Sequence, residues 1–161
     1  MTCVTNYSRI YDRYDANPDR HRIAVDEEIR ALLKRAGRAG VVRVLDLACG
    51  TGNWLAVQMA AYATQPVEWH GLDACEDMLR LARAKVPAAR LVAGRAEHLP
   101  YADRQFDLVA VNFAFHHFED KEAALDEIAR VLAPAGIVRM NNVAPEQADH
   151  WWVYRYFPAA V

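Results

Sequence analysis

The residues best suited to chemistry fall in one short stretch, RVLDLACGTGNWL at 43–55. Gly50 and Gly52 bracket Thr51, and glycines at such a turn let a ligand approach the backbone closely. Asp46 precedes the turn, where a bound pyrophosphate would meet its carboxylate in a partly desolvated site. The stretch therefore favours a cationic ligand over a phosphate-bearing one.

A second acid, Asp73, ends the next apolar run and lies 21 residues after Gly52. A carboxylate at this spacing from the glycines can accept hydrogen bonds from ribose hydroxyls. A dinucleotide-binding turn would carry glycine or alanine where this chain has Leu55, which disfavours a nicotinamide oxidoreductase. S-adenosylmethionine fits both acids, because it contains adenosine, a sulfonium and an amino group but no phosphate.

Hydrophobic periodicity predicts the elements that must position these residues. Strands are expected at 41–47, 67–73, 89–94, 106–115 and within 133–143, and helices at 22–36, 53–63, 75–85 and 121–132. This alternation indicates a doubly wound α/β fold, with a parallel sheet and helices on both faces. A ligand is then expected beyond the carboxyl ends of the strands, where both acids fall.

Composition narrows the function classes. The chain has 161 residues, 53% of them hydrophobic, which fits one globular domain with a real core. Its net charge of -2 shows no basic excess, so no nucleic-acid partner is expected. The three cysteines have no metal-ligand spacing, and no apolar run is long enough to span a membrane. With a polar N-terminus, these features indicate a cytoplasmic protein without a metal site.

Taken together, the motifs resemble those of the class I S-adenosylmethionine-dependent methyltransferases, and most closely their small-molecule and quinone group. The resemblance rests on LDLACGTGNW (45–54), GLDACEDMLRLAR (71–83), AGRAEHLPYADRQFDLVAVNFAFHHF (93–118) and EIARVLAPAGIVRM (127–140). It implies a Rossmann-like sheet of strand order 3-2-1-4-5. It also implies S-adenosylmethionine as cofactor, S-adenosylhomocysteine as product and a small-molecule methyl acceptor.

The resemblance assigns roles position by position. The methionine part of the cofactor would be bound by Asp46, Ala48, Gly50, Thr51, Gly52, Asn112 and Phe113. Asp73 would hold the ribose, and the adenine would meet Ala74, Met78 and Ala96, while Arg95 and Glu97 are further candidates for the cofactor site. His116 and His117 are the catalytic candidates. Tyr7, Tyr14, Trp151, Trp152 and Tyr156 would cover the site or face the acceptor.

Two departures from the family pattern stand out. The family usually reads GDAE where this chain reads GRAE, so Arg95 replaces an aspartate that accepts from the adenine amino group. Arginine cannot accept a hydrogen bond, so Arg95 is expected to stack on the adenine or to point to solvent. The family also continues through a sixth and a seventh strand, whereas this chain ends soon after the fifth.

Several alternatives remain open. Each histidine could act as a base, or one could pack and the other line the pocket, since methyl transfer needs only alignment of sulfonium and nucleophile. Glu97 could touch the adenine or lie in a solvated turn, and Asp15 is expected on a solvated helix face. An exposed fifth strand, or the aromatic segment 150–158, could form a homodimer interface.

The resulting expectation is a single domain over 1–161: a helical cap at 1–36, a Rossmann-like core at 41–143 and an aromatic lid or interface at 144–161. The expected reaction is proximity-driven SN2 methyl transfer to a small molecule. An inactive or truncated cofactor-binding module is the alternative, and an NAD-dependent oxidoreductase is less favoured.

Overall fold

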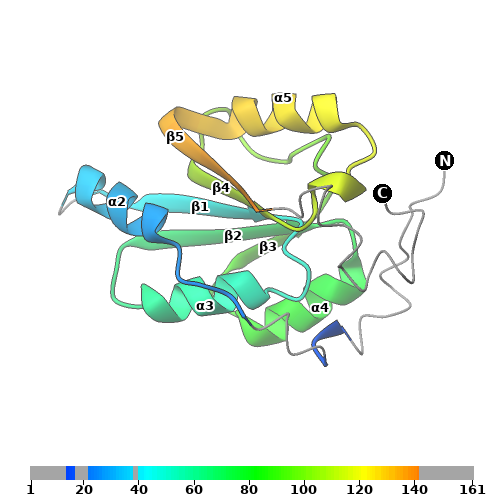
Figure 1. The fold of residues 1–161 in the computed structure, drawn as a ribbon, viewed down its shortest axis with the longest axis horizontal. Helices are drawn as coiled ribbons and strands as arrows, with labels where there is room; N and C mark the ends of the chain where they lie inside the picture. Colours follow the sequence, from blue (N-terminus) through cyan, green and yellow to red (C-terminus); the bar gives the residue numbers. More distant parts are fainter. Residues whose placement is uncertain (1–13, 17–21, 38–39, 142–161) are drawn as a thin grey trace.

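Five parallel strands form the centre of the molecule in a computed structural model that describes residues 14–16, 22–37 and 40–141 (Figure 1). The strands are β1 (Val42–Leu47), β2 (Val67–Asp73), β3 (Arg90–Ala93), β4 (Phe106–Asn112) and β5 (Leu132–Asn141). They lie in the order β3-β2-β1-β4-β5, and every neighbouring pair is parallel. The predicted fold class and strand order are confirmed.

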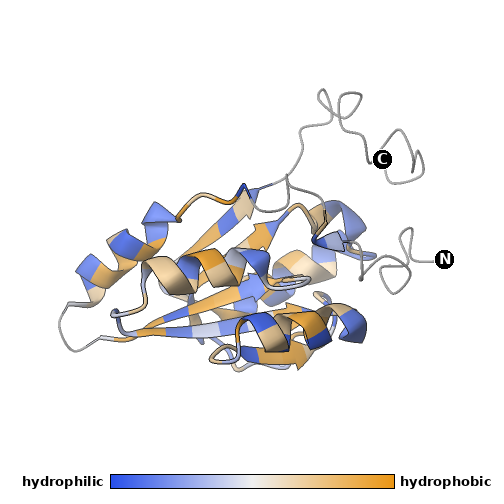
Figure 2. Ribbon diagram, turned by 90° about the horizontal axis from the view of Figure 1, so that it is seen from below, coloured by the Kyte–Doolittle hydropathy of each residue, from blue (hydrophilic) through white to orange (hydrophobic). Residues whose placement is uncertain are grey.

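Helices cover both faces of this sheet. α2 (Glu27–Ala36), α3 (Asn53–Ala61) and α4 (Glu76–Lys85) pack on one face, where Ile29, Leu55 and Leu79 belong to a single buried cluster. α5 (Lys121–Val131) packs on the other face, with Ile128 in a second cluster. In Figure 2 the strands are largely hydrophobic and the helices alternate between hydrophilic and hydrophobic residues, as amphipathic helices on a buried sheet should.

The register of the central strands places the candidate site at one edge of the sheet. Val44 of β1 packs into the first cluster and Leu45 into the second, because successive side chains point to opposite faces. Asp46 is level with Gly71 of β2 and with Ala110 of β4. The turns that follow β1, β2 and β4 therefore emerge side by side.

Two predicted elements differ in length from those observed. The helix expected over 22–36 begins only at Glu27, because the Asp26 side chain accepts from the Glu28 N–H and caps it there. The strand expected over 106–115 ends at Asn112. Phe113 has φ +53°, which takes the chain out of the extended conformation, and a 3₁₀ turn, η3 (Phe115–His117), follows.

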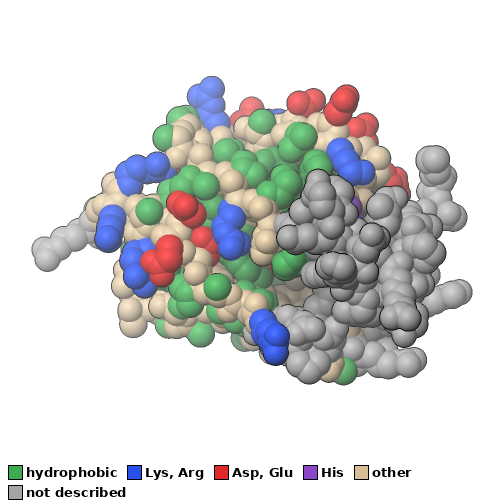
Figure 3. All heavy atoms as spheres, in the orientation of Figure 1, with side chains coloured by type: hydrophobic (Ala, Val, Ile, Leu, Met, Phe, Trp, Pro, Cys, Tyr) green, Lys and Arg blue, Asp and Glu red, His purple; other side chains and the backbone are tan. Residues whose placement is uncertain are grey.

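β5 lies at one edge of the sheet, and within the described residues no strand pairs with its outer side. A bulge separates its first residue from the rest: Phe106 pairs with Leu132, but Leu108 pairs with Ile137. Val138 is 41% exposed and Met140 is 40% exposed, and Figure 3 shows hydrophobic side chains at the surface of this region. A homodimer through this edge stays a prediction, as does the division into cap, core and lid, since 142–161 lies outside the described residues.

Candidate functional site

The carboxyl ends of β1, β2, β3 and β4 surround a cavity of about 530 Å³. Most of the residues expected at the site line it: Tyr14, Ala48, Gly50, Asp73, Ala74, Met78, Arg95, Ala96, Glu97, Asn112, Phe113 and His117. The sequence did not single out the remaining lining residues, which are Leu47, Leu72, Cys75, Gly94, Ala114, Phe118 and Glu119. For most of these seven residues, the sequence offers only one sign of a role at the site: they lie next to the end of a predicted strand. Glu119 is the one charged residue among the seven.

Other expected residues do not line the cavity. Asp46, Thr51 and Gly52 are buried behind the wall formed by the glycine turn. His116 is next to His117, with the ring centroids 3.9 Å apart, but only His117 lines the cavity. Tyr7, Trp151, Trp152 and Tyr156 lie outside the described residues.

Asp73 joins the glycine turn to the start of α4. Its Oδ2 accepts from the Gly50 N–H at 2.7 Å, and its Oδ1 accepts from the Cys75 N–H at 2.8 Å. Burial raises the pKa of Asp73, and the backbone N–H groups partly offset this. Since a carboxylate oxygen can accept more than one hydrogen bond, the fixed carboxylate keeps capacity for ligand hydroxyls.

Gly50 and Gly52 both have positive φ, at +55° and +76°. A Cβ at Gly52 would lie 3.2 Å from the side chains of Ala82 and Val86, so the turn packs directly on α4. The glycines thus give the turn both its conformation and its close approach to the helix.

Asp46 lies beneath the cavity and is 2% exposed. Its Oδ1 accepts from Asn112 Nδ2 at 3.3 Å. Burial raises the pKa of Asp46 to about 8; the bond from Asn112 lowers the pKa and the nearby Asp73 carboxylate raises it. This carboxyl group is therefore unusually costly to ionise, and a cation bound above it would relieve that cost.

Asn112 is itself held from the other side. Its Oδ1 accepts from Arg139 Nη1 at 3.3 Å, and Arg139 Nε lies 3.0 Å from Asp26 Oδ2. With its oxygen held by Arg139, the amide presents its NH₂ group to Asp46. This chain of contacts connects α2, β5, β4 and β1 beneath the cavity.

Arg95, Glu97 and Glu119 form one charged wall of the cavity. Glu97 is 9% exposed, and its Oε1 accepts from the backbone N–H groups of Glu119 at 2.9 Å and Asp120 at 3.4 Å. The solvated-turn alternative for Glu97 was therefore wrong. Burial acts to raise the pKa of Glu97, but these N–H groups and Arg95 bring it below its usual value.

Arg95 is exposed, in line with one of the two expectations for it, and its guanidinium also forms two ion pairs. Its Nε lies 3.3 Å from Glu97 Oε2, and its Nη2 lies 2.9 Å from Glu119 Oε2. The guanidinium thus bridges the segment after β3 to the segment before α5.

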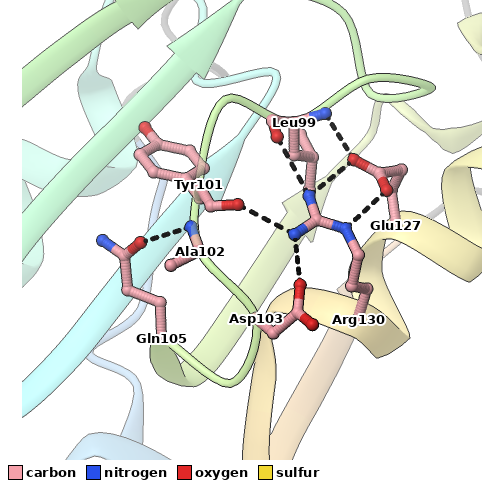
Figure 4. A network of polar contacts seen from close by, with 7 residues as sticks. All are labelled: Leu99, Tyr101, Ala102, Asp103, Gln105, Glu127 and Arg130. Carbon is pink, nitrogen blue, oxygen red and sulfur yellow. Dashed lines mark hydrogen bonds and ion pairs between the residues drawn. The ribbon is translucent and has the colours of Figure 1, made fainter.

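Arg130 of α5 holds the loop that follows this wall, as Figure 4 shows. Its guanidinium donates to the carbonyl of Leu99 at 3.0 Å, to the carbonyl of Tyr101 at 2.8 Å and to Asp103 at 2.8 Å. Glu127 accepts from Arg130 and also from the Leu99 N–H at 2.6 Å. The loop takes the place of a crossover helix between β3 and β4, and these contacts fix its path from outside the cavity.

Asp15 is part of a polar cluster and not of a solvated helix face, which corrects the expectation for it. Its carboxylate pairs with Lys85 at 2.7 Å and accepts from Thr51 Oγ1 at 2.7 Å and Asn53 Nδ2 at 2.9 Å. Lys85 also donates to Asn53. Tyr14, the neighbour of Asp15, lines the cavity, so the cluster holds a short N-terminal segment beside the glycine turn.

The described part of the chain also shows where the cysteines lie and how the possible metal ligands are spread. No group of three or more His, Cys, Asp or Glu residues there could hold a metal ion. Cys49 is buried and Cys75 half-buried, both as free thiols. Burial, together with Asp46 and Asp73, raises the pKa of Cys49 well above its usual value. Within the same residues, no helix is both long and apolar enough to cross a membrane.

Comparison with known proteins agrees with this geometry. A family model described as a methyltransferase domain matches residues 44–136. The demethylmenaquinone methyltransferase of Lactiplantibacillus plantarum is 36% identical over 153 residues, which cover 91% of this chain and 62% of that protein.

Solved structures give the same result. YcgJ of Bacillus subtilis is 30% identical with a TM-score of 0.56, over 71% of this chain and 49% of that one. The Haloferax volcanii protein solved with the Trm112 methyltransferase activator is 26% identical with a TM-score of 0.71, over 96% of this chain and 66% of that one. The chain thus spans about half to two-thirds of the length of these relatives. It belongs to the class I S-adenosylmethionine-dependent methyltransferase family.

Proposed function

We propose that this chain binds S-adenosylmethionine in the cavity at the strand ends and transfers its methyl group to a small molecule. The observation that carries the proposal is the pair of carboxylates at the glycine turn. Asp73 faces the cavity with both oxygens anchored by backbone N–H groups, and Asp46 lies buried beneath it. These two acidic groups fit a ligand with ribose hydroxyls and a positive charge, and they do not fit a pyrophosphate.

Different residues would bind the ribose, the methionine part and the adenine of the cofactor. Asp73 would accept from the ribose hydroxyls, while Gly50 and Ala48 allow close approach of the methionine part. Asp46, ionised beneath the bound ligand, would favour its ammonium group electrostatically. Met78, Ala74 and Ala96 would enclose the adenine, with the Ala96 N–H as a donor to the ring. Thr51 and Gly52 would act by holding the turn in shape, since neither lines the cavity.

The bound cofactor supplies an electrophilic methyl group on its sulfonium. The protein's part is to align an acceptor with that methyl group and to exclude water. His117, Phe113 and Phe118 line the cavity, so they are placed to contact an acceptor. His117, and not His116, is the candidate base for an acceptor that must lose a proton.

The acceptor class is proposed from the relatives. Those with demethylmenaquinone methyltransferase in their names favour a quinol-like ring, which also suits the aromatic side of the cavity. A panel of reduced quinones, phenols and amines, with product S-adenosylhomocysteine as the readout, tests this class. Turnover of amines alone would contradict the quinol-like acceptor.

Calorimetry tests the binding proposal directly. S-adenosylmethionine and S-adenosylhomocysteine should release heat on binding, and NAD should not. Asp73→Ala should weaken both by about tenfold or more, because a charged acceptor for two hydroxyls is lost. Asp126→Ala, at an exposed position on α5, is the matched control and should bind as wild type does. Heat with NAD alone would refute the proposal, and binding without turnover on the panel would favour a cofactor-binding module.

A further inference from the structure

The charged wall of the cavity lacks the acidic residue that the family pattern would place at position 95. Arg95 stands there, and its guanidinium has only donors. An adenine ring, however, presents a 6-amino group that needs an acceptor. The wall must therefore supply an acceptor from another position, or leave that amino group unrecognised.

Two carboxylates line the same wall, and their surroundings differ. Glu97 is almost wholly engaged: Oε1 accepts from two backbone N–H groups, and Oε2 pairs with Arg95. Its side chain is only 10% exposed. Glu119 has a side chain that is 54% exposed, and its ion pair with Arg95 uses Oε2. Glu119 is thus the more exposed and less engaged of the two carboxylates, with the greater acceptor capacity toward a ligand.

We propose that Glu119, held in place by Arg95, accepts the hydrogen bond from the 6-amino group of the adenine. The assignment rests on the proposed function, because it assumes that the cofactor occupies this cavity. Glu119 comes from the segment before α5, and the residue it replaces would come from the segment after β3. Arg95 joins these two segments through its 2.9 Å contact with Glu119. The acid that is missing at position 95 is therefore replaced by the acid at position 119, on the facing segment.

Arg95 is a positioning residue in this arrangement. Its contact with Glu97 fixes one side of the guanidinium, and Glu97 is itself anchored by the backbone at the start of α5. The other side then holds Glu119 in a defined orientation. Without Arg95 the exposed Glu119 side chain would sample several rotamers, and a hydrogen bond to adenine would require ordering it.

If Glu119 accepts a hydrogen bond from the 6-amino group, the protein should distinguish adenine from a purine that has a carbonyl at that position. A general electrostatic effect of Glu119 would not produce this preference. The test compares S-adenosylhomocysteine with S-inosylhomocysteine, in which a carbonyl replaces the 6-amino group, by calorimetry. Wild type should prefer the adenosine compound by about tenfold. Glu119→Ala should reduce that ratio to near one. Arg95→Ala should reduce it by severalfold, since the acceptor remains but is no longer oriented.

Glu122→Ala is the matched control, because Glu122 is an exposed acid on the first turn of α5 that does not line the cavity. It should keep the wild-type ratio. A Glu119→Ala protein that binds S-adenosylhomocysteine with an unchanged ratio would overturn the assignment and leave the proposed function intact. Wild type that prefers the inosine compound would show that Arg95 donates to the 6-position instead. Wild type that binds neither compound would refute the proposed function and this assignment with it.

Discussion

Replacing Asp46 by asparagine should stabilise the protein and weaken its binding of S-adenosylmethionine. Asp46 is 2% exposed, and burial raises its pKa to about 8, although the bond from Asn112 acts in the opposite direction. An asparagine oxygen can still accept from Asn112 Nδ2, and it carries no charge. The variant therefore keeps the hydrogen bond and removes the unfavourable ionisation.

The size of the effect follows from the difference between the folded and unfolded pKa. An unfolded aspartate ionises near pH 4, so between about pH 4 and pH 8 the folded protein holds a proton that the unfolded chain has released. The free energy of unfolding of wild type then falls by about 1.4 kcal/mol for each unit of rising pH, and this loss levels off above pH 8. At pH 7 the contribution of Asp46 is about 4 kcal/mol lower than at pH 4, and Asp46→Asn escapes that loss.

Urea unfolding at pH 5, 6, 7 and 8 measures this difference, with the fluorescence of the buried Trp54 and Trp69 as the signal. The gap between Asp46→Asn and wild type should widen steadily with pH. Asp126→Asn, at an exposed position, should follow wild type. A gap that stays constant from pH 5 to pH 8 would refute the reasoning. Calorimetry on the same variants should show about tenfold weaker cofactor binding for Asp46→Asn alone, because asparagine cannot ionise beneath the bound cation.

Three further substitutions test how the site is held. Arg130→Met should lower the free energy of unfolding by about 1–3 kcal/mol and weaken S-adenosylhomocysteine binding, because the loop carbonyls it holds lose their donor; urea unfolding and calorimetry check this. Lys85→Met should weaken binding by a fewfold with little change in urea midpoint, since it releases the segment beside the glycine turn. Gly52→Ala should cost about 1–3 kcal/mol, more than Gly50→Ala, because both glycines have positive φ but only Gly52 has close neighbours; equal urea midpoints for the two would contradict this.

The sequence predicts the sheet well because the central strands are buried on both faces. Such strands must be continuous apolar runs, and runs such as the one at 106–112 are visible without any structural knowledge. The glycine turn and Asp73 are predictable for a related reason: backbone conformation and ribose recognition each demand a particular residue type at a particular place. The parallel pairing of β1 with β2 then places the glycine turn beside Asp73.

The residues that hold the site could not be predicted in this way. Arg130 and Glu127 carry the spacing of an ordinary charged pair on a helix surface, and nothing in their types shows that they bind loop carbonyls. Asp15 looks solvated because its partners Thr51 and Lys85 are far away in sequence. Arg95 is visible as a departure from the family pattern, but its pairing with Glu119 depends on how two loops approach each other in space.

The contacts between α2 and β5 have a consequence for synthesis on the ribosome. Asp26 pairs with Arg139, and Arg35 donates to the carbonyl of Ala135, 100 residues later in the chain. Before β5 is translated, the Asp26 carboxylate lacks the Arg139 guanidinium that pairs with it in the folded protein. α2 can therefore pack early on the sheet through Ile29 and Leu32, but its position is fixed only when β5 has left the ribosome. A nascent chain arrested ahead of residue 135 should leave α2 open to a protease, and release past residue 141 should protect it.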